Sequence, residues 1–117
     1  MPASKSKPAR SPCPVACTLD ILGDKWTLLI VRDLHLGRSL FRDFQASPER
    51  IASNILANRL ARLVEHGLVE TFPSERKAGT DAYRLTDKGK QLKPLLDVIV
   101  DWGLKHIEGT EARLGTG

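Results

Sequence analysis

The sequence predicts a domain of the α+β class that is mainly α-helical. Apolar residues recur at helical spacing in four successive segments up to Gly67, and again from Thr86 onward. Between these parts, residues 68–72 and 82–85 are rich in β formers and alternate between apolar and polar side chains, which predicts two strands. The length of 117 residues leaves room for one domain, so we expect a single small β-hairpin packed among helices.

The composition is that of a globular protein. Hydrophobic residues make up 41% of the chain and charged residues 27%. No apolar run approaches the roughly 18 residues that a membrane helix needs, and the first residues lack the apolar segment of a secretory signal. The two cysteines, Cys13 and Cys17, are too few for a disulfide framework. We therefore expect a cytoplasmic protein with no membrane partner.

Both ends of the chain are expected to lie outside the folded domain. Residues 1–12 contain Lys5, Lys7 and Arg10 and no acidic residue, which predicts a flexible basic tail. Residues 13–107 form the predicted domain. Residues 108–117 contain a single large apolar side chain and are expected to form a C-terminal tail.

The first three predicted helices are short. Pro14 suits the first turn of the first helix, and glycine at position 23 ends it. Asp24 is expected to cap the second helix, which runs as far as the glycine at position 37. Ser39 is expected to cap a third helix, which the Ser-Pro pair at 47–48 breaks.

The fourth predicted helix is longer and strongly amphipathic. It begins near Ala52–Ser53 and ends before Gly67, and its buried side is expected to consist of three leucines: Leu56, Leu60 and Leu63. After the hairpin, Thr86 is expected to cap one long final helix, which Pro94 bends. This order of elements is that of a winged helix-turn-helix with an additional N-terminal helix and a long C-terminal dimerisation helix.

At the level of residues, the chain resembles the HxlR-type transcriptional regulators, a branch of the MarR-like winged-helix superfamily. The resemblance rests on the order and spacing of six segments: Cys13–Val15, Leu22–Leu34, Phe41–Gln45, Ile51–Leu63, His66–Val69 and Tyr83–Gly89. It implies a homodimer that binds operator DNA and regulates transcription, without enzymatic activity and without a cofactor.

The distribution of charge agrees with a polyanionic partner such as double-stranded DNA. The chain has a net charge of +4. Residues 1–12 contribute +3, and residues 38–62 contribute +3 because five arginines there oppose only Asp43 and Glu49.

The outer face of the fourth helix is expected to read base edges in the major groove. Opposite the three leucines lie Asn54 and Asn58, one turn apart, and an asparagine amide can pair with adenine through two hydrogen bonds. Ala57 and Ala61 permit close approach and can meet a thymine methyl group.

Phosphate contacts are expected from the basic and hydroxyl residues that flank this helix: Arg38, Ser39, Arg42, Arg50, Ser53 and Arg62. Ser53 is also expected to cap the helix. At the tip of the hairpin, Arg76 and Lys77 are expected to reach the minor groove. Arg59 turns toward the inner side of its helix, and we expect it to have a structural role, paired with a carboxylate such as Asp43.

Two apolar stripes predict the dimer interface. The first and last helices carry more apolar surface than so small a core can cover, and the interface is expected to include Val15, Leu19, Leu95, Ile99 and Trp102. A two-fold dimer of this kind presents two recognition helices to a pseudo-palindromic operator.

Cys13 is a candidate sensor of oxidants or electrophiles. It precedes Pro14 at a helix start, where free backbone N–H groups favour the thiolate. The resemblance adds that this cysteine serves as a sensor in some family members, although those with a disulfide switch use a distant second cysteine that is absent here. Cys17 is expected to be a small buried residue.

Two other functions are open to a chain of this kind. Winged helices also serve as protein–protein interaction modules, which is the main alternative to specific DNA binding. A thiol enzyme centred on Cys13 is disfavoured because no general base is recognisable, and the spacing of the histidines and cysteines predicts no metal site.

Overall fold

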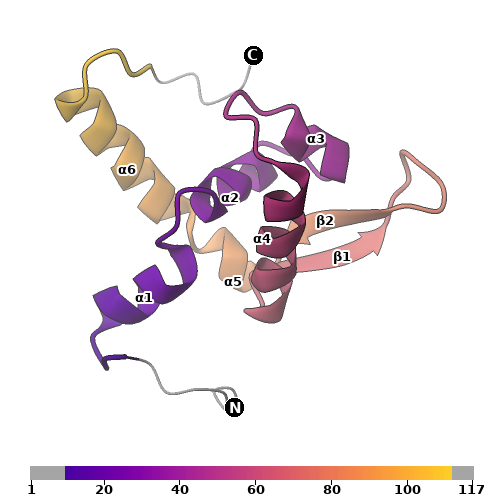
Figure 1. Ribbon diagram of the computed structural model, residues 1–117, viewed down its shortest axis with the longest axis horizontal. Coiled ribbons are helices and arrows are strands. Elements are labelled where there is room, and N and C mark those ends of the chain that lie inside the picture. The colour runs from indigo at the N-terminus through magenta and orange to yellow at the C-terminus, as the bar shows by residue number, and fades with distance from the viewer. Residues whose placement is uncertain (1–9, 112–117) are drawn as a thin grey trace.

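The computed structural model describes residues 10–111, and Figure 1 shows the arrangement of their elements. Within this range the chain forms six helices and one two-stranded antiparallel sheet, which confirms the mainly helical α+β class. The elements are α1 (Pro14–Leu22), α2 (Thr27–His35), α3 (Phe41–Gln45), α4 (Ser53–Glu65), β1 (Val69–Pro73), β2 (Asp81–Leu85), α5 (Asp87–Lys90) and α6 (Lys93–His106).

A single hydrophobic core holds α2, α3, α4 and the hairpin together. The three leucines predicted for the inner side of α4 are at most 1% exposed, as the helical spacing predicted. They belong to one cluster with buried residues of α2, α3 and both strands: Ile30, Val31, Leu34, Phe44, Val69 and Leu85. Because this core takes up one face of α4, the opposite face of that helix points away from it.

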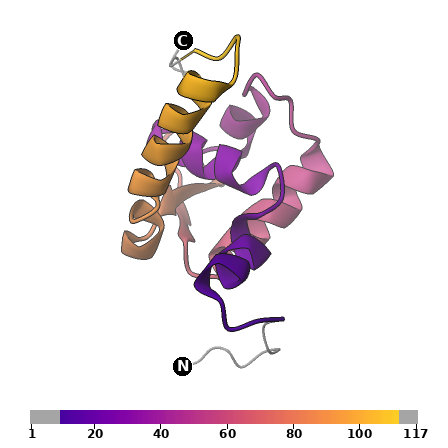
Figure 2. The same cartoon turned by 90° about the vertical axis from the view of Figure 1, so that its left-hand side faces the viewer.

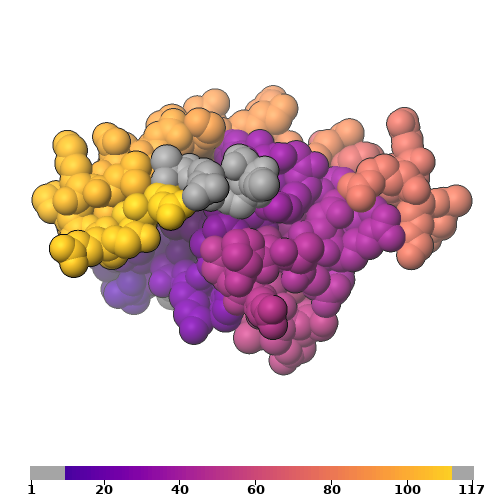
Figure 3. All heavy atoms as spheres, turned by 90° about the horizontal axis from the view of Figure 1, so that it is seen from above, coloured from indigo at the N-terminus to yellow at the C-terminus, as the bar shows by residue number. Residues whose placement is uncertain are grey.

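The hairpin forms the wing of the fold. Strands β1 and β2 pair from Val69 opposite Leu85 to Pro73 opposite Asp81. The backbone N–H of Tyr83 also donates to the carbonyl of Ser39 at 2.8 Å, which attaches the sheet to the segment between α2 and α3. The loop between the strands projects from one end of the molecule, far from the C-terminal helix (Figure 3).

Helices α1 and α6 lie on the side of the molecule opposite the wing (Figures 1 and 2). Leu22 is the one buried residue of α1, and no residue of α6 is buried. Both helices therefore expose apolar side chains that the rest of residues 10–111 does not cover.

The start of α3 corrects one predicted cap. Asp24 does accept the backbone N–H groups of Trp26 and Thr27, at 3.0 and 3.2 Å, as predicted for the second helix. At α3, however, the hydroxyl of Ser39 caps nothing. The carboxylate of Asp43, in the first turn, accepts the N–H groups of Ser39 and Leu40 at 3.2 and 2.9 Å. An acidic residue three positions after the last non-helical residue is the signal for such a cap.

The predictions for Ser53 and Pro94 were also wrong in part. Helix α4 begins at Ser53 without a side-chain cap, and the Ser53 hydroxyl instead accepts the Gln45 amide at 2.7 Å. The predicted final helix is two helices. Thr86 caps the first through the N–H of Gly89, whereas Pro94 lies in the first turn of the second, where its missing N–H costs nothing. Pro94 therefore lies at the start of α6 and does not bend a longer helix.

The described parts of the two predicted tails make contacts with the domain. The Arg10 side chain donates to the Asp20 carboxylate of α1 at 2.7 Å, and the Thr110 hydroxyl donates to the carbonyls of Gly103 and Ile107 at the end of α6. Lys5, Lys7 and residues 112–117 lie outside the described residues. Across residues 10–111, no helix has the length and apolar character that crossing a membrane requires.

Candidate nucleic-acid interface

The outer face of α4 presents the four residues predicted to read bases. Asn54, Ala57, Asn58 and Ala61 are all exposed, on the side of the helix opposite the buried leucines. These side chains are short, so a groove of DNA can approach the helix closely along this face. The structure brings the four residues together as predicted, while base contact itself stays a prediction.

An ion pair behind α4 orients one of these asparagines. The Arg59 guanidinium donates to the Asp24 carboxylate at 2.8 Å and to the side-chain oxygen of Asn58. The structural role predicted for Arg59 is correct, but its partner is Asp24 and not Asp43. Burial raises the pKa of Asp24, but hydrogen bonds from Thr27, Arg59 and the Trp26 N–H outweigh this effect and bring it to about 2.

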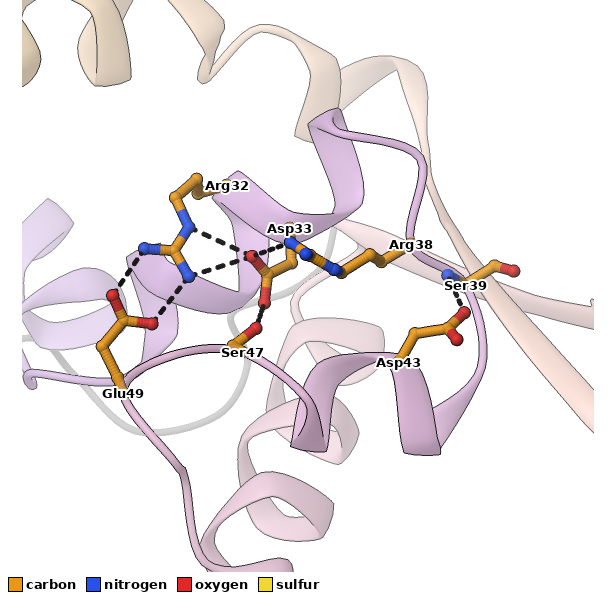
Figure 4. Close-up of polar contacts among 7 residues, drawn as sticks. All are labelled: Arg32, Asp33, Arg38, Ser39, Asp43, Ser47 and Glu49. Carbon is orange, nitrogen blue, oxygen red and sulfur yellow. Dashed lines mark hydrogen bonds and ion pairs between the residues drawn. The ribbon is translucent and has the colours of Figure 1, made fainter. Parts of the chain in front are cut away.

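A buried polar network fixes the segment that leads into α4. Figure 4 shows the Arg32 guanidinium between two carboxylates. It donates two hydrogen bonds to Glu49, at 2.9 and 2.8 Å, and one to Asp33 at 3.1 Å. Asp33, only 2% exposed, also accepts the Ser47 hydroxyl and the Arg38 guanidinium.

This network connects α2 with residues 47–49. Buried charges are stable only when they are paired and hydrogen-bonded, so the network disfavours other positions of this segment. The hydrogen bonds that Arg32 donates to Glu49 lower the pKa of Glu49 and raise the pKa of Arg32. Sequence reasoning missed Arg32, Asp33 and Glu49 because an arginine inside an apolar helix segment does not by itself disclose its partners.

The four arginines predicted to contact phosphate fall into two groups. Arg42 and Arg50 are exposed, and neither side chain has a hydrogen-bond or ion-pair partner among residues 10–111. The other two arginines are engaged within the protein. Arg38 pairs with Asp33 at 3.0 Å, and Arg62 donates to a backbone carbonyl of α1 at 3.2 Å.

The wing brings a further pair together that the sequence did not predict. Arg76 donates to Asp43 through both terminal nitrogens, at 2.7 and 3.2 Å. The hydrogen bond from Arg76 lowers the pKa of Asp43 to about 2, against an opposing effect of burial. Lys77, the second wing residue of the prediction, is exposed and forms no ion pair among the described residues.

The residues predicted for the dimer interface are exposed on α1 and α6. Val15, Leu19, Leu95 and Ile99 line one apolar groove between these two helices. Trp102 lies one turn further along α6, with 59% of its surface exposed and its ring 4.9 Å from that of His106. The structure thus joins the two predicted apolar stripes into one surface.

The two cysteines occupy different environments. Cys13 is exposed and lies at the N-cap of α1, with its backbone N–H donating to the Ser11 hydroxyl. Cys17 is partly buried, and its thiol donates to the Ser11 carbonyl at 3.1 Å. In the part of the chain that the structure describes, no three His, Cys, Asp or Glu side chains form a group that could hold a metal ion.

Comparison with known proteins places this fold in a family. A family model described as HxlR-like helix-turn-helix matches residues 21–111. The uncharacterized HTH-type transcriptional regulator YdeP of Bacillus subtilis is 31% identical over 94 residues, which cover 80% of this chain and 73% of YdeP.

Two solved structures extend the comparison. PA1607, for which a role as transcription factor is proposed, is 45% identical with a TM-score of 0.80, over 89% of this chain and 74% of PA1607. The redox regulator HypR in its reduced form is 26% identical with a TM-score of 0.73, over 82% of this chain and 95% of HypR. The family model covers most of the chain, and the protein belongs to the HxlR-like helix-turn-helix family of transcriptional regulators.

Proposed function

We propose that the protein is a sequence-specific DNA-binding regulator that acts as a homodimer on a pseudo-palindromic operator. The observation that carries this proposal is the exposed face of α4, with Asn54 and Asn58 one turn apart on a helix whose other face is fixed in the core. An asparagine at such a position can form two hydrogen bonds with the edge of an adenine in the major groove.

Backbone contacts surround this reading face. Arg42 and Arg50 are free to bind phosphates, Arg38 and Ser39 lie between α2 and α3, and Ser53 and Arg62 lie on α4 itself. The wing residues Arg76 and Lys77 are positioned on a projecting loop that suits the minor groove. Phosphate contacts fix the register of the protein on DNA, and the asparagines supply the sequence preference.

The homodimer forms through α1 and α6. Val15 is 66% exposed and Trp102 59% exposed, which is unusual for large apolar side chains that share a surface on a small domain. A two-fold axis through this surface places the two α4 helices on successive turns of the major groove.

Cys13 makes the regulator responsive to oxidants or electrophiles. The thiol is exposed and lies at the start of α1, a helix of the proposed dimer interface. HypR, a relative of similar fold, is a redox regulator. A modification at Cys13 therefore changes the geometry of the dimer and with it the fit to the operator.

Selection of DNA by the purified protein tests this function. Sequencing the fragments retained from a random pool gives the operator as a repeated pseudo-palindrome. Asn58→Ala is then expected to weaken binding to this operator by about ten- to a hundredfold and binding to random duplex much less. The reason is that contacts to base edges determine which DNA sequence is preferred.

Arg42→Ala is the matched control, since it removes an exposed phosphate contact. It is expected to weaken binding to both DNAs alike. It should also reduce the slope of the logarithm of the binding constant against the logarithm of the salt concentration by about one. Equal losses on both DNAs for Asn58→Ala contradict its role as a reader. A wild-type protein that shows no salt-sensitive binding to any duplex favours the protein–protein interaction module instead.

A further inference from the structure

The ion pair between the wing and α3 occupies a residue that the proposed function needs elsewhere. Arg76 binds the Asp43 carboxylate through two hydrogen bonds, and these residues are 33 positions apart in the sequence. The two terminal nitrogens that donate to Asp43 form the end-on fork of the guanidinium, which is also the fork that reaches a phosphate or a groove acceptor beyond the tip of the side chain. Arg76 therefore cannot keep both bonds to Asp43 and present that fork to DNA.

Both partners are held where they meet. The Asp43 carboxylate is fixed by the backbone N–H groups of Ser39 and Leu40, and its side chain is only 17% exposed. On the wing, the Ser74 hydroxyl accepts the N–H groups of Arg76 and Lys77, at 3.0 and 3.2 Å. The pair thus requires less ordering of long side chains than an ordinary surface ion pair does.

We propose that Asp43 and DNA compete for the Arg76 guanidinium, so that this carboxylate lowers the affinity of the wing for DNA. The inference rests on the proposed function and concerns its regulation by a residue of the same chain. DNA binding transfers Arg76 from the carboxylate to the DNA backbone or groove.

Release of Arg76 leaves Asp43 with partners. The carboxylate keeps the N–H groups of Ser39 and Leu40, which stabilise its charge after the guanidinium has moved. The Arg76 side chain is 51% exposed, so the pair is of the partly solvated kind that contributes little to stability. The dense negative charge of a duplex can therefore displace the carboxylate.

A double-mutant cycle with Asp43 and Arg76 tests the competition. Asp43→Asn removes the charge and keeps a side-chain oxygen for the N–H groups that it caps. On random-sequence duplex at low salt, Asp43→Asn is expected to bind about two- to fivefold more tightly than the wild type. Arg76→Ala is expected to cost about two- to fivefold more affinity in the Asp43→Asn protein than in the wild type, since only there is the guanidinium free from the start.

Glu75→Gln is the matched control for the loss of one negative charge. Glu75 neighbours Arg76 in the wing loop, is exposed, and forms no ion pair among residues 10–111. In the Glu75→Gln protein, Arg76→Ala is expected to cost the same as in the wild type. Asp43→Gln is a second variant for the cycle, because glutamine at this position of a helix also caps the preceding N–H groups.

The outcomes separate this inference from the proposed function. An Arg76→Ala cost that is equal or smaller in the Asp43→Asn and Asp43→Gln proteins overturns the competition while DNA binding stands. It then indicates that the pair stays closed on DNA and braces the wing. A wild-type protein that does not bind the duplex at all contradicts the proposed function itself.

Discussion

Three aspartates decide where the arginines of the interface lie. Asp24 holds Arg59, Asp33 holds Arg32 and Arg38, and Asp43 holds Arg76. The count of arginines in this region predicts a basic surface, but the pairing divides them into structural residues and residues free for phosphate. Exposed Arg42 and Arg50 belong to the second group.

The charge of Asp24 makes stability depend on acid pH. Its pKa falls from an ordinary 3.8 to about 2 in the folded chain. A carboxyl with a lower pKa in the folded state stabilises the fold above its unfolded value, and this stabilisation is lost as the pH falls from about 4 to about 2. We expect the free energy of unfolding to decrease by about 1–2 kcal/mol from this group over that window, after allowance for solvent screening.

Urea denaturation at pH 5 and pH 2.5 measures this effect. Asp24→Asn is expected to be less stable than the wild type at pH 5 and to lose less stability on acidification. Asp97→Asn is the control, since the Asp97 carboxylate is 60% exposed and pairs with Lys93 on the helix surface. The prediction fails if Asp24→Asn and the wild type lose the same amount.

At the scale of elements, the sequence predicts what depends on local patterns. The bounds of α1, the inner leucines of α4 and the two strands follow from spacing and from glycine, proline and β-branched residues, all of which act within a few positions. The break between α5 and α6 was missed because Pro94 is equally compatible with a bend and with a first turn.

The pairs that position the interface could not be predicted in the same way. Asp24 and Arg59 are 35 positions apart, and Asp43 and Arg76 are 33 apart. Any of several acidic residues could have met each arginine, and only the packing of α2, α3 and the wing selects one. The exposed face of α4, by contrast, was predictable because it lies opposite the buried leucines, whose helical spacing is visible in the sequence.

Gly89 shows how one element depends on a missing side chain. A Cβ at this position would lie 2.1 Å from the Leu68 carbonyl oxygen and 2.9 Å from the Leu85 side chain, so α5 meets the hairpin too closely for alanine. We expect Gly89→Ala to destabilise the domain by about 1–3 kcal/mol through overpacking.

Thermal denaturation checks this prediction against a second glycine. Gly103 lies within α6, where an added Cβ meets no atom within 4 Å. Gly103→Ala is therefore expected to be neutral or to stabilise the helix by up to about 1 kcal/mol. A loss of stability for Gly103→Ala as large as that for Gly89→Ala contradicts the steric explanation.

At the scale of the whole molecule, the residues proposed to read DNA lie on the wing and α4, and those proposed to form the dimer lie on α1 and α6, at the opposite end from the wing (Figure 1). Most of the exposed large apolar residues among those described lie on α1 and α6. A monomer leaves the apolar residues of α1 and α6 exposed, whereas the proposed dimer covers them and brings two copies of the proposed reading face together.

Dimerisation is expected to depend on Ile99 and Trp102. The double variant Ile99→Ala with Trp102→Ala removes large apolar side chains from the proposed interface, so its dissociation constant is expected to rise at least tenfold. Operator affinity falls with it, because two half-sites no longer act together. Analytical ultracentrifugation measures the first effect and fluorescence anisotropy the second.

Val64→Ala is the control for this experiment. Val64 is 40% exposed, lies on α4 and does not line the groove between α1 and α6, so its loss is expected to leave dimerisation unchanged. A wild-type protein that sediments as a monomer at micromolar concentration contradicts the proposed assembly, as does a double variant that dimerises as well as the wild type.

The last prediction concerns the response of this assembly to oxidation. Hydrogen peroxide or a quinone is expected to modify exposed Cys13 faster than partly buried Cys17. Cys13 directly precedes Pro14, which lines the same groove as Val15 and Leu19 of the proposed interface. Operator binding should then fall and return with a thiol reductant where the product is a sulfenic acid or a disulfide. Cys13→Ser is expected to bind the operator normally and ignore the oxidant, and Cys17→Ser to respond like the wild type. Mass spectrometry with anisotropy titrations follows both steps, and operator binding that survives complete modification of Cys13 rules the sensor out.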